Sequence, residues 1–118
     1  MFSVAQEDVL KALKRFRRLA KQDLLASAKT PDPAFWRRQA EIRRAQYQEL
    51  MDQIAEEGVV AAYRRAVSQY AELPLLSESE RDPLVGGKEQ ALEMFFSVLG
   101  LSEMARTRLR NARRRVRG

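Results

Sequence analysis

The chain contains neither cysteine nor histidine. Without cysteine there is no disulfide framework and no thiolate chemistry. Without histidine the sequence lacks the commonest general base and the commonest metal ligand. No apolar run approaches the roughly 20 residues that span a bilayer, and the start of the chain lacks the basic-then-apolar order of a signal peptide. We therefore expect a cytoplasmic protein with no metal, cofactor, catalytic residue, membrane contact or small-molecule substrate.

Charge is unevenly distributed along the chain. Its 118 residues suit a single helical domain, 1–118, with a modest core that favours self-association. The net charge of +6 divides into +4 for residues 1–30, −2 for 31–58, −2 for 59–100 and +6 for 101–118. Two basic ends thus flank a slightly acidic middle, which indicates that the ends bind nucleic acid or an acidic protein surface.

The first predicted helix covers residues 4–28, and Ser3 with Gln6 has the spacing of a capping box at its start. Apolar side chains recur along one face at Val9, Leu13, Phe16, Ala20 and Leu24. The other positions carry six cations: Lys11, Lys14, Arg15, Arg17, Arg18 and Lys21. We interpret these as candidate phosphate contacts, with a solvated basic face as the equal alternative.

Two Asp-Pro pairs mark the starts of further helices, because each places an N-cap acid before a proline at the first helical position. They predict helices over residues 33–57 and 83–99. Between these, residues 59–73 are expected to be helical, with a short extended segment as the alternative, and residues 75–81 to form an exposed polar loop. The predicted fold is all-α, with long helices in an antiparallel hairpin or bundle.

Apolar positions on two of these helices are predicted to contact other copies of the chain in the oligomerisation core, residues 31–100. On residues 33–57 they form a heptad-like seam interrupted by Arg43. The candidate interface residues are Trp36, Tyr47, Leu50, Ile54, Phe95, Phe96 and Leu99. For Trp36, the only tryptophan, we favour a core or interface anchor over a platform for stacking bases.

An elbow follows the helix over 83–99. Gly100 can adopt the left-handed conformation that closes a helix, and Ser102 can cap the next one, predicted over residues 102–116. This last helix carries Arg106, Arg108, Arg110, Arg113, Arg114, Arg115 and Arg117. Arginine binds phosphates and carboxylates bidentately, so we expect the tail to bind nucleic acid or an acidic protein and to be frayed until it does. A solubilising, disordered basic terminus is the alternative.

Motifs for catalysis are weak. Gly86-Gly87-Lys88 lacks the spaced glycines and the Ser or Thr of a phosphate-binding loop. Neighbouring acids, such as Glu56-Glu57, are ordinary at a helix end. We expect no enzymatic activity.

The elbow resembles the C-terminal signature of a group of phage terminase small subunits. In that group an LGL(T/S)P turn leads into xxRxRL, which residues 99–109 follow apart from Glu103, where the group usually has proline. Asp82-Pro83 and Gly58 are similar to the group's helix start and helix end.

The resemblance implies a non-enzymatic DNA-packaging adaptor. It would form a homo-oligomeric ring, bind viral double-stranded DNA and hand it to the terminase large subunit in the host bacterial cytoplasm. Residues 33–57 and 83–99 would build the ring wall, and Arg106 and Arg108 match the signature cations. The chain beyond Leu109 would reach DNA or the large subunit.

Two other functions are compatible with the residues. One is a small helical nucleic-acid-binding or regulatory protein that acts as a dimer through the Trp36–Ile54 seam. The other is an adaptor that binds only an acidic protein.

Overall fold

The computed structural model describes residues 2–115, which form five α-helices and two short 3₁₀ helices. The α-helices are α1 (Gln6–Ala26), α2 (Pro33–Glu57), α3 (Val59–Glu72), α4 (Pro83–Val98) and α5 (Glu103–Asn111). The 3₁₀ helices are η1 (Ser27–Lys29) and η2 (Glu78–Glu80). Within the described residues the only β-type pairing is one isolated bridge, between Leu75 and Arg115. The prediction of an all-α fold is confirmed.

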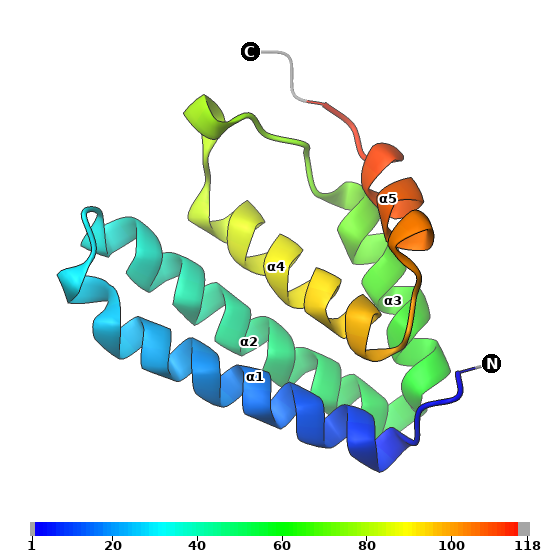
Figure 1. The fold of residues 1–118 in the computed structure, drawn as a ribbon. Helices are drawn as coiled ribbons and strands as arrows, with labels where there is room; N and C mark the ends of the chain where they lie inside the picture. The colour runs from blue at the N-terminus through cyan, green and yellow to red at the C-terminus, as the bar shows by residue number, and fades with distance from the viewer. Residues whose placement is uncertain (1, 116–118) are drawn as a thin grey trace.

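Helix α2 is central to the arrangement. It forms an antiparallel hairpin with α1, and α4 packs along it as well (Figure 1). Helix α3 follows α2 after a sharp turn, and α5 returns from α4 to lie against α3 (Figure 1). The basic N-terminal helix α1 therefore packs on α2, whereas the basic C-terminal helix α5 packs on α3.

The core lies where α1, α2, α3 and α4 face one another. Its side chains come from the apolar positions that recur every three or four residues in each helix. The largest fully buried side chains are Val9, Leu13, Leu50, Ile54, Leu92, Phe95 and Phe96. Aromatic edge-to-face contacts join α3 to α4, with the Tyr70 and Phe96 ring centroids 5.4 Å apart. The single chain thus covers its own apolar stripes.

The predicted helix boundaries that rest on Asp-Pro and glycine are confirmed. Asp32 accepts a hydrogen bond from the Phe35 amide at 3.2 Å, and Asp82 accepts one from the Leu84 amide at 2.8 Å. Helix α2 ends at Glu57 and is capped by Gly58, whose φ of +90° is a conformation that residues with a Cβ rarely adopt. Residues 59–72 are helical, as we expected.

Two expectations at the chain ends are wrong. Ser3 and Gln6 form no capping box, because α1 begins at Gln6 and its N-cap is Ala5, which places Ser3 outside the cap. The last helix ends at Asn111 and does not continue towards 116, because the chain turns there to bond with the α3–α4 connection. A capping box does occur in the loop, where Ser77 and Glu80 cap η2.

Gly87 sets how closely α4 approaches α2. A Cβ added at this position would lie 2.7 Å from the Ile42 Cβ and 2.8 Å from the Gln39 carbonyl oxygen. Real Cβ atoms essentially never show such short contacts, so any other residue here would push the two helices apart. The glycine that weakens α4 as an isolated helix is the one that lets it pack.

Candidate nucleic-acid interface

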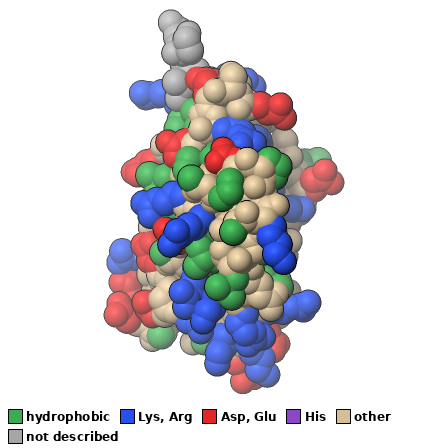
Figure 2. Space-filling model, turned by 90° about the vertical axis from the view of Figure 1, so that its left-hand side faces the viewer, with side chains coloured by type: hydrophobic (Ala, Val, Ile, Leu, Met, Phe, Trp, Pro, Cys, Tyr) green, Lys and Arg blue, Asp and Glu red, His purple; other side chains and the backbone are tan. Residues whose placement is uncertain are grey.

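Helix α1 presents a continuous cationic face. Residues 9–22 contain six cations and no acid. Five of these cations are exposed and form no ion pair within residues 2–115: Lys11, Lys14, Arg15, Arg18 and Lys21. They recur at helical spacing on the side of α1 opposite to Val9, Leu13 and Ala20, which are buried against α2 and α4. In Figure 2, Lys and Arg side chains gather at the lower end of the molecule, the α1 side of Figure 1.

Arg17 differs from the other cations of α1. Its Nη1 donates a hydrogen bond to Gln48 Oε1 on α2, so this guanidinium spans the two helices of the hairpin. Together with Arg44 it lines a shallow groove between α1 and α2. Of the six cations predicted as phosphate contacts, Arg17 is therefore the one that is half-buried and bonded to α2, at the border of the exposed cationic face.

The C-terminal arginines do not form one basic surface either. Arg113 is only 3% exposed. Its Nε donates to the Leu73 carbonyl at 2.9 Å, and its Nη2 donates to the Pro74 carbonyl at 2.8 Å and to Glu89 Oε2 at 2.7 Å. The guanidinium also lies 4.7 Å from the Tyr70 ring centroid. The prediction that Arg113 binds a partner is wrong, because its Nε and Nη2 hold the end of the chain on the α3–α4 connection and its Nη1 is buried, without a hydrogen-bond partner among the described residues.

Arg110 is likewise paired with acids of its own chain. Its Nη1 lies 3.2 Å from Glu89 Oε1 and 3.5 Å from Glu93 Oε2. Burial is the largest single influence and lowers the pKa of Arg110, but the hydrogen bond to Glu89 and the negative charges of Glu89 and Glu93 together outweigh it and leave the pKa above its ordinary value. The same Glu93 accepts a hydrogen bond from the Tyr70 hydroxyl, and burial together with that bond raises the pKa of Tyr70.

The rest of the tail is only partly exposed. Arg108, Arg114 and Arg115 are exposed, and none of the three forms an ion pair in the described part of the chain. Arg106 is half-buried. The Leu75 amide donates to the Arg114 carbonyl at 2.9 Å, so the chain up to residue 115 is hydrogen-bonded to the α3–α4 connection. Arg117 lies outside the described residues.

Six of the seven predicted interface residues are buried within the chain itself. Tyr47, Leu50, Ile54, Phe95, Phe96 and Leu99 are each at most 3% exposed and belong to the core cluster. They cannot contact a second copy in this fold, so that prediction is wrong for these six. The reason is that α1, α3 and α4 cover the stripe that we assigned to other subunits. Trp36, at 38% exposed, is the one member on the surface.

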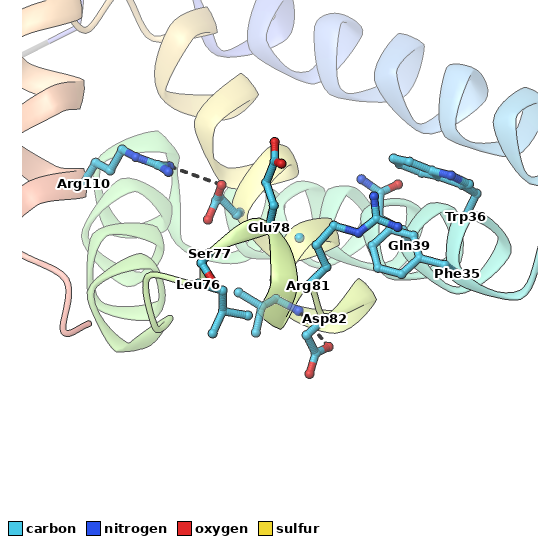
Figure 3. Close-up of a pocket in the computed structure, with 12 residues that line it drawn as sticks. Phe35, Trp36, Gln39, Leu76, Ser77, Glu78, Arg81, Asp82 and Arg110 are labelled. Carbon is cyan, nitrogen blue, oxygen red and sulfur yellow. Dashed lines mark hydrogen bonds and ion pairs between the residues drawn. The ribbon is translucent and has the colours of Figure 1, made fainter. Parts of the chain in front are cut away.

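An aromatic cavity that we did not expect lies beside Trp36. Phe35 and Trp36 meet edge to face with ring centroids 5.0 Å apart. Arg81 reaches from the loop before α4, and its guanidinium carbon lies 4.3 Å from the Phe35 ring centroid (Figure 3). A cation over an aromatic face is attracted by the ring quadrupole. The cavity, of about 240 Å³, extends from this pair to Arg110 and Glu89.

Comparison of the chain with protein-family models, with curated proteins and with solved structures gave no match. Among residues 2–115, no helix has the length and apolarity needed to cross a membrane. The described residues also contain no cluster of three or more acids placed to hold a metal ion. The properties of the molecule that bear on function are thus its cationic surfaces and its cavities.

Proposed function

We propose that this chain is a non-enzymatic protein that binds double-stranded DNA through the exposed cationic face of α1. The observation that carries the proposal is the set of five exposed cations on residues 11–21, which lack acidic partners among the described residues. The C-terminal arginines support it less, because Arg110 and Arg113 are bound to Glu89. The main phosphate contact is therefore assigned to the N-terminal helix.

The spacing of charge on α1 suits a duplex. From Lys11 to Lys21 the helix rises about 15 Å, along which a duplex presents roughly nine phosphate charges. Five cations on that length can each reach a phosphate without a fixed register, which makes the contact independent of DNA sequence. If all five are used, log affinity should fall with log salt at a slope of about −4 to −5.

We further propose that this DNA binding serves genome packaging, as the resemblance of residues 99–109 to terminase small subunits implies. In that role the chain would form a homo-oligomeric ring and recruit a large subunit with ATPase and nuclease activity. Arg108 and the other exposed arginines of the C-terminal segment would then be free to contact that subunit. The ring contacts would have to come from other exposed apolar side chains such as Leu25 and Leu84, because the core side chains are already covered.

The alternative is a small nucleic-acid-binding or regulatory protein that forms no ring. One observation favours it: the apolar side chains expected at the ring wall are buried within one chain. Native mass spectrometry separates the two functions. An assembly larger than a tetramer supports the packaging adaptor, whereas a monomer or dimer that still binds DNA supports the alternative.

DNA binding itself is tested by fluorescence anisotropy with a labelled duplex at several salt concentrations. In the triple variant K14Q/R15Q/R18Q the salt slope should become shallower by about 2.7, because each phosphate that is no longer neutralised reduces it by about 0.9. The matched control, R108Q/R114Q/R115Q, removes the same charge from the other basic surface and should leave the slope nearly unchanged. Equal effects of the two variants, or an unchanged slope in the first, would overturn the assignment to α1.

A further inference from the structure

Trp36 separates two cavities. One is the aromatic cavity with Phe35 and Arg81, and Arg81 lies 5.7 Å from the Trp36 ring centroid on that side. The other, of about 230 Å³, lies between α1, α2 and α4. Trp36 is the only tryptophan of the chain and is 38% exposed, although the core of the same helix is well covered. Its indole is therefore a partly open wall of the second cavity.

Two polar side chains that line the second cavity, Arg43 and Gln90, have donors without a hydrogen-bond partner among the described residues. Arg43 is 8% exposed, and its Nε and Nη2 are bonded to Gln39 at 2.9 Å and Asp23 at 2.7 Å. Its third nitrogen, Nη1, has no hydrogen-bond partner within the described residues. Gln90 accepts from Gln39 at 2.8 Å, which leaves its own amide nitrogen without a partner among residues 2–115. A buried guanidinium on α2 and an exposed amide on α4 thus offer donors beside an aromatic ring.

We propose that this cavity binds one unpaired nucleobase, stacked on Trp36. Base edges carry carbonyl and ring-nitrogen acceptors, which match the free donors of Arg43 and Gln90. Every base also has a π-face that can stack on an indole. The volume of the cavity, about 230 Å³, is smaller than the roughly 300–1,000 Å³ of most small-molecule sites. It therefore suits one ring system and not a whole nucleotide cofactor.

The position of the cavity relative to α1 points to nucleic acid as the source of the base. Ala26, which lines the cavity, lies on the same side of α1 as Arg15, because eleven residues make just over three full helical turns. The rise from Arg15 to Ala26 is about 16 Å, which is roughly five base-pair steps along one strand. A duplex held on α1 could thus present a base from its single-stranded end to Trp36. This inference rests on the proposed DNA binding.

The consequence is a preference for duplexes with a single-stranded extension over blunt ones. Stacking one base on an aromatic side chain changes affinity by roughly 5- to 150-fold when the side chain is replaced by alanine. We expect the wild-type chain to bind the extended duplex tighter than the blunt one by a factor in this range. W36A should lose that preference and W36F should keep most of it, while blunt-duplex affinity stays the same in all three.

The test combines anisotropy with the intrinsic emission of Trp36, which needs no label on the protein. Emission should be quenched by the extended duplex and by the free single strand, but not by the blunt duplex. Q90A should weaken the extension preference without changing blunt-duplex binding. Circular dichroism melts confirm that each variant is folded, and the emission titration of the wild type does not depend on any variant.

Several results would overturn the inference. They are equal affinity for the two duplexes with unchanged emission, a preference that survives in W36A, and a W36A variant whose only change is its native mass. The last would assign Trp36 to a contact between copies of the chain. Failure of the blunt duplex to bind would refute the proposed function instead, and the free single strand then still tests the base contact through Trp36 emission.

Discussion

Replacement of Arg113 by alanine should destabilise the fold strongly, although the residue lies near the end of the chain. The substitution removes three hydrogen bonds of 2.7–2.9 Å and leaves Glu89 and the carbonyls of Leu73 and Pro74 without their cation. Removing one partner of a buried ion pair costs about 3–5 kcal/mol. Glu89 is 26% exposed and retains Arg110, so the lower figure applies here, about 3 kcal/mol.

Urea and thermal unfolding, followed by circular dichroism, measure this change. A loss of about 3 kcal/mol corresponds to a melting temperature lower by roughly 12 °C for a chain of this size. Arg113→Lys keeps the charge but not the forked geometry, so it should recover only part of the loss. The exposed neighbour provides the control, and Arg114→Gln should stay within about 0.5 kcal/mol of the wild type.

A double-mutant cycle with Glu89→Gln identifies the source of the effect. If the ion pair matters, the two substitutions together should cost less than the sum of the two single losses. An Arg113→Ala variant as stable as the wild type would refute the reasoning, because it would mean that the C-terminal segment contributes nothing to the fold.

Three further predictions concern the fold. Gly87→Ala should cost about 1–3 kcal/mol in urea unfolding, because its Cβ would meet Ile42 and the Gln39 carbonyl; an unchanged midpoint would contradict this. Asp82→Ala should cost about 1 kcal/mol, since it removes the N-cap of α4. Burial raises the pKa of Tyr47 to about 12. The unfolded phenol loses its proton near pH 10 while the folded one keeps it, so stability should fall as pH rises from about 10 to 12. Tyr47→Phe should reduce this loss in alkaline unfolding measurements, and the raised pKa of Tyr70 should account for part of what remains.

The features that could be predicted from the sequence are those that depend on local chemistry. Asp32-Pro33 and Asp82-Pro83 fix helix starts because an N-cap acid and a proline at the first position act within a few residues. Gly58 and Gly100 fix helix ends through their positive φ. The basic face of α1 could also be predicted, since helical spacing alone separates its cations from its apolar stripe.

Which arginines are exposed and which are paired with groups of the same chain could not be predicted from local chemistry. Arg110 and Arg113 look like Arg108 and Arg114 in the sequence, and only partners 17 to 40 residues away distinguish them. The cavity beside Trp36 depends on Arg43 and Gln90 from two helices for the same reason.

The apolar stripes also have two interpretations. A seam such as Tyr47, Leu50 and Ile54 has the same pattern whether another subunit or the same chain covers it. The capping box expected from Ser3 and Gln6 does not form, because this spacing marks a helix start only if the serine is the N-cap, and the N-cap of α1 is Ala5.

The anchoring of Arg113 limits how this chain can be shortened. A truncation after Leu109 removes Arg110 and Arg113 together, so Glu89 and the turn at Leu73 and Pro74 lose the groups that hold them. If such a fragment bound a ligand more weakly, the cause would be the loss of folded structure and not the loss of a direct contact between an arginine and the ligand. Deletion mapping is therefore the wrong tool for the C-terminal arginines, and charge-neutral substitutions in the complete chain are the right one.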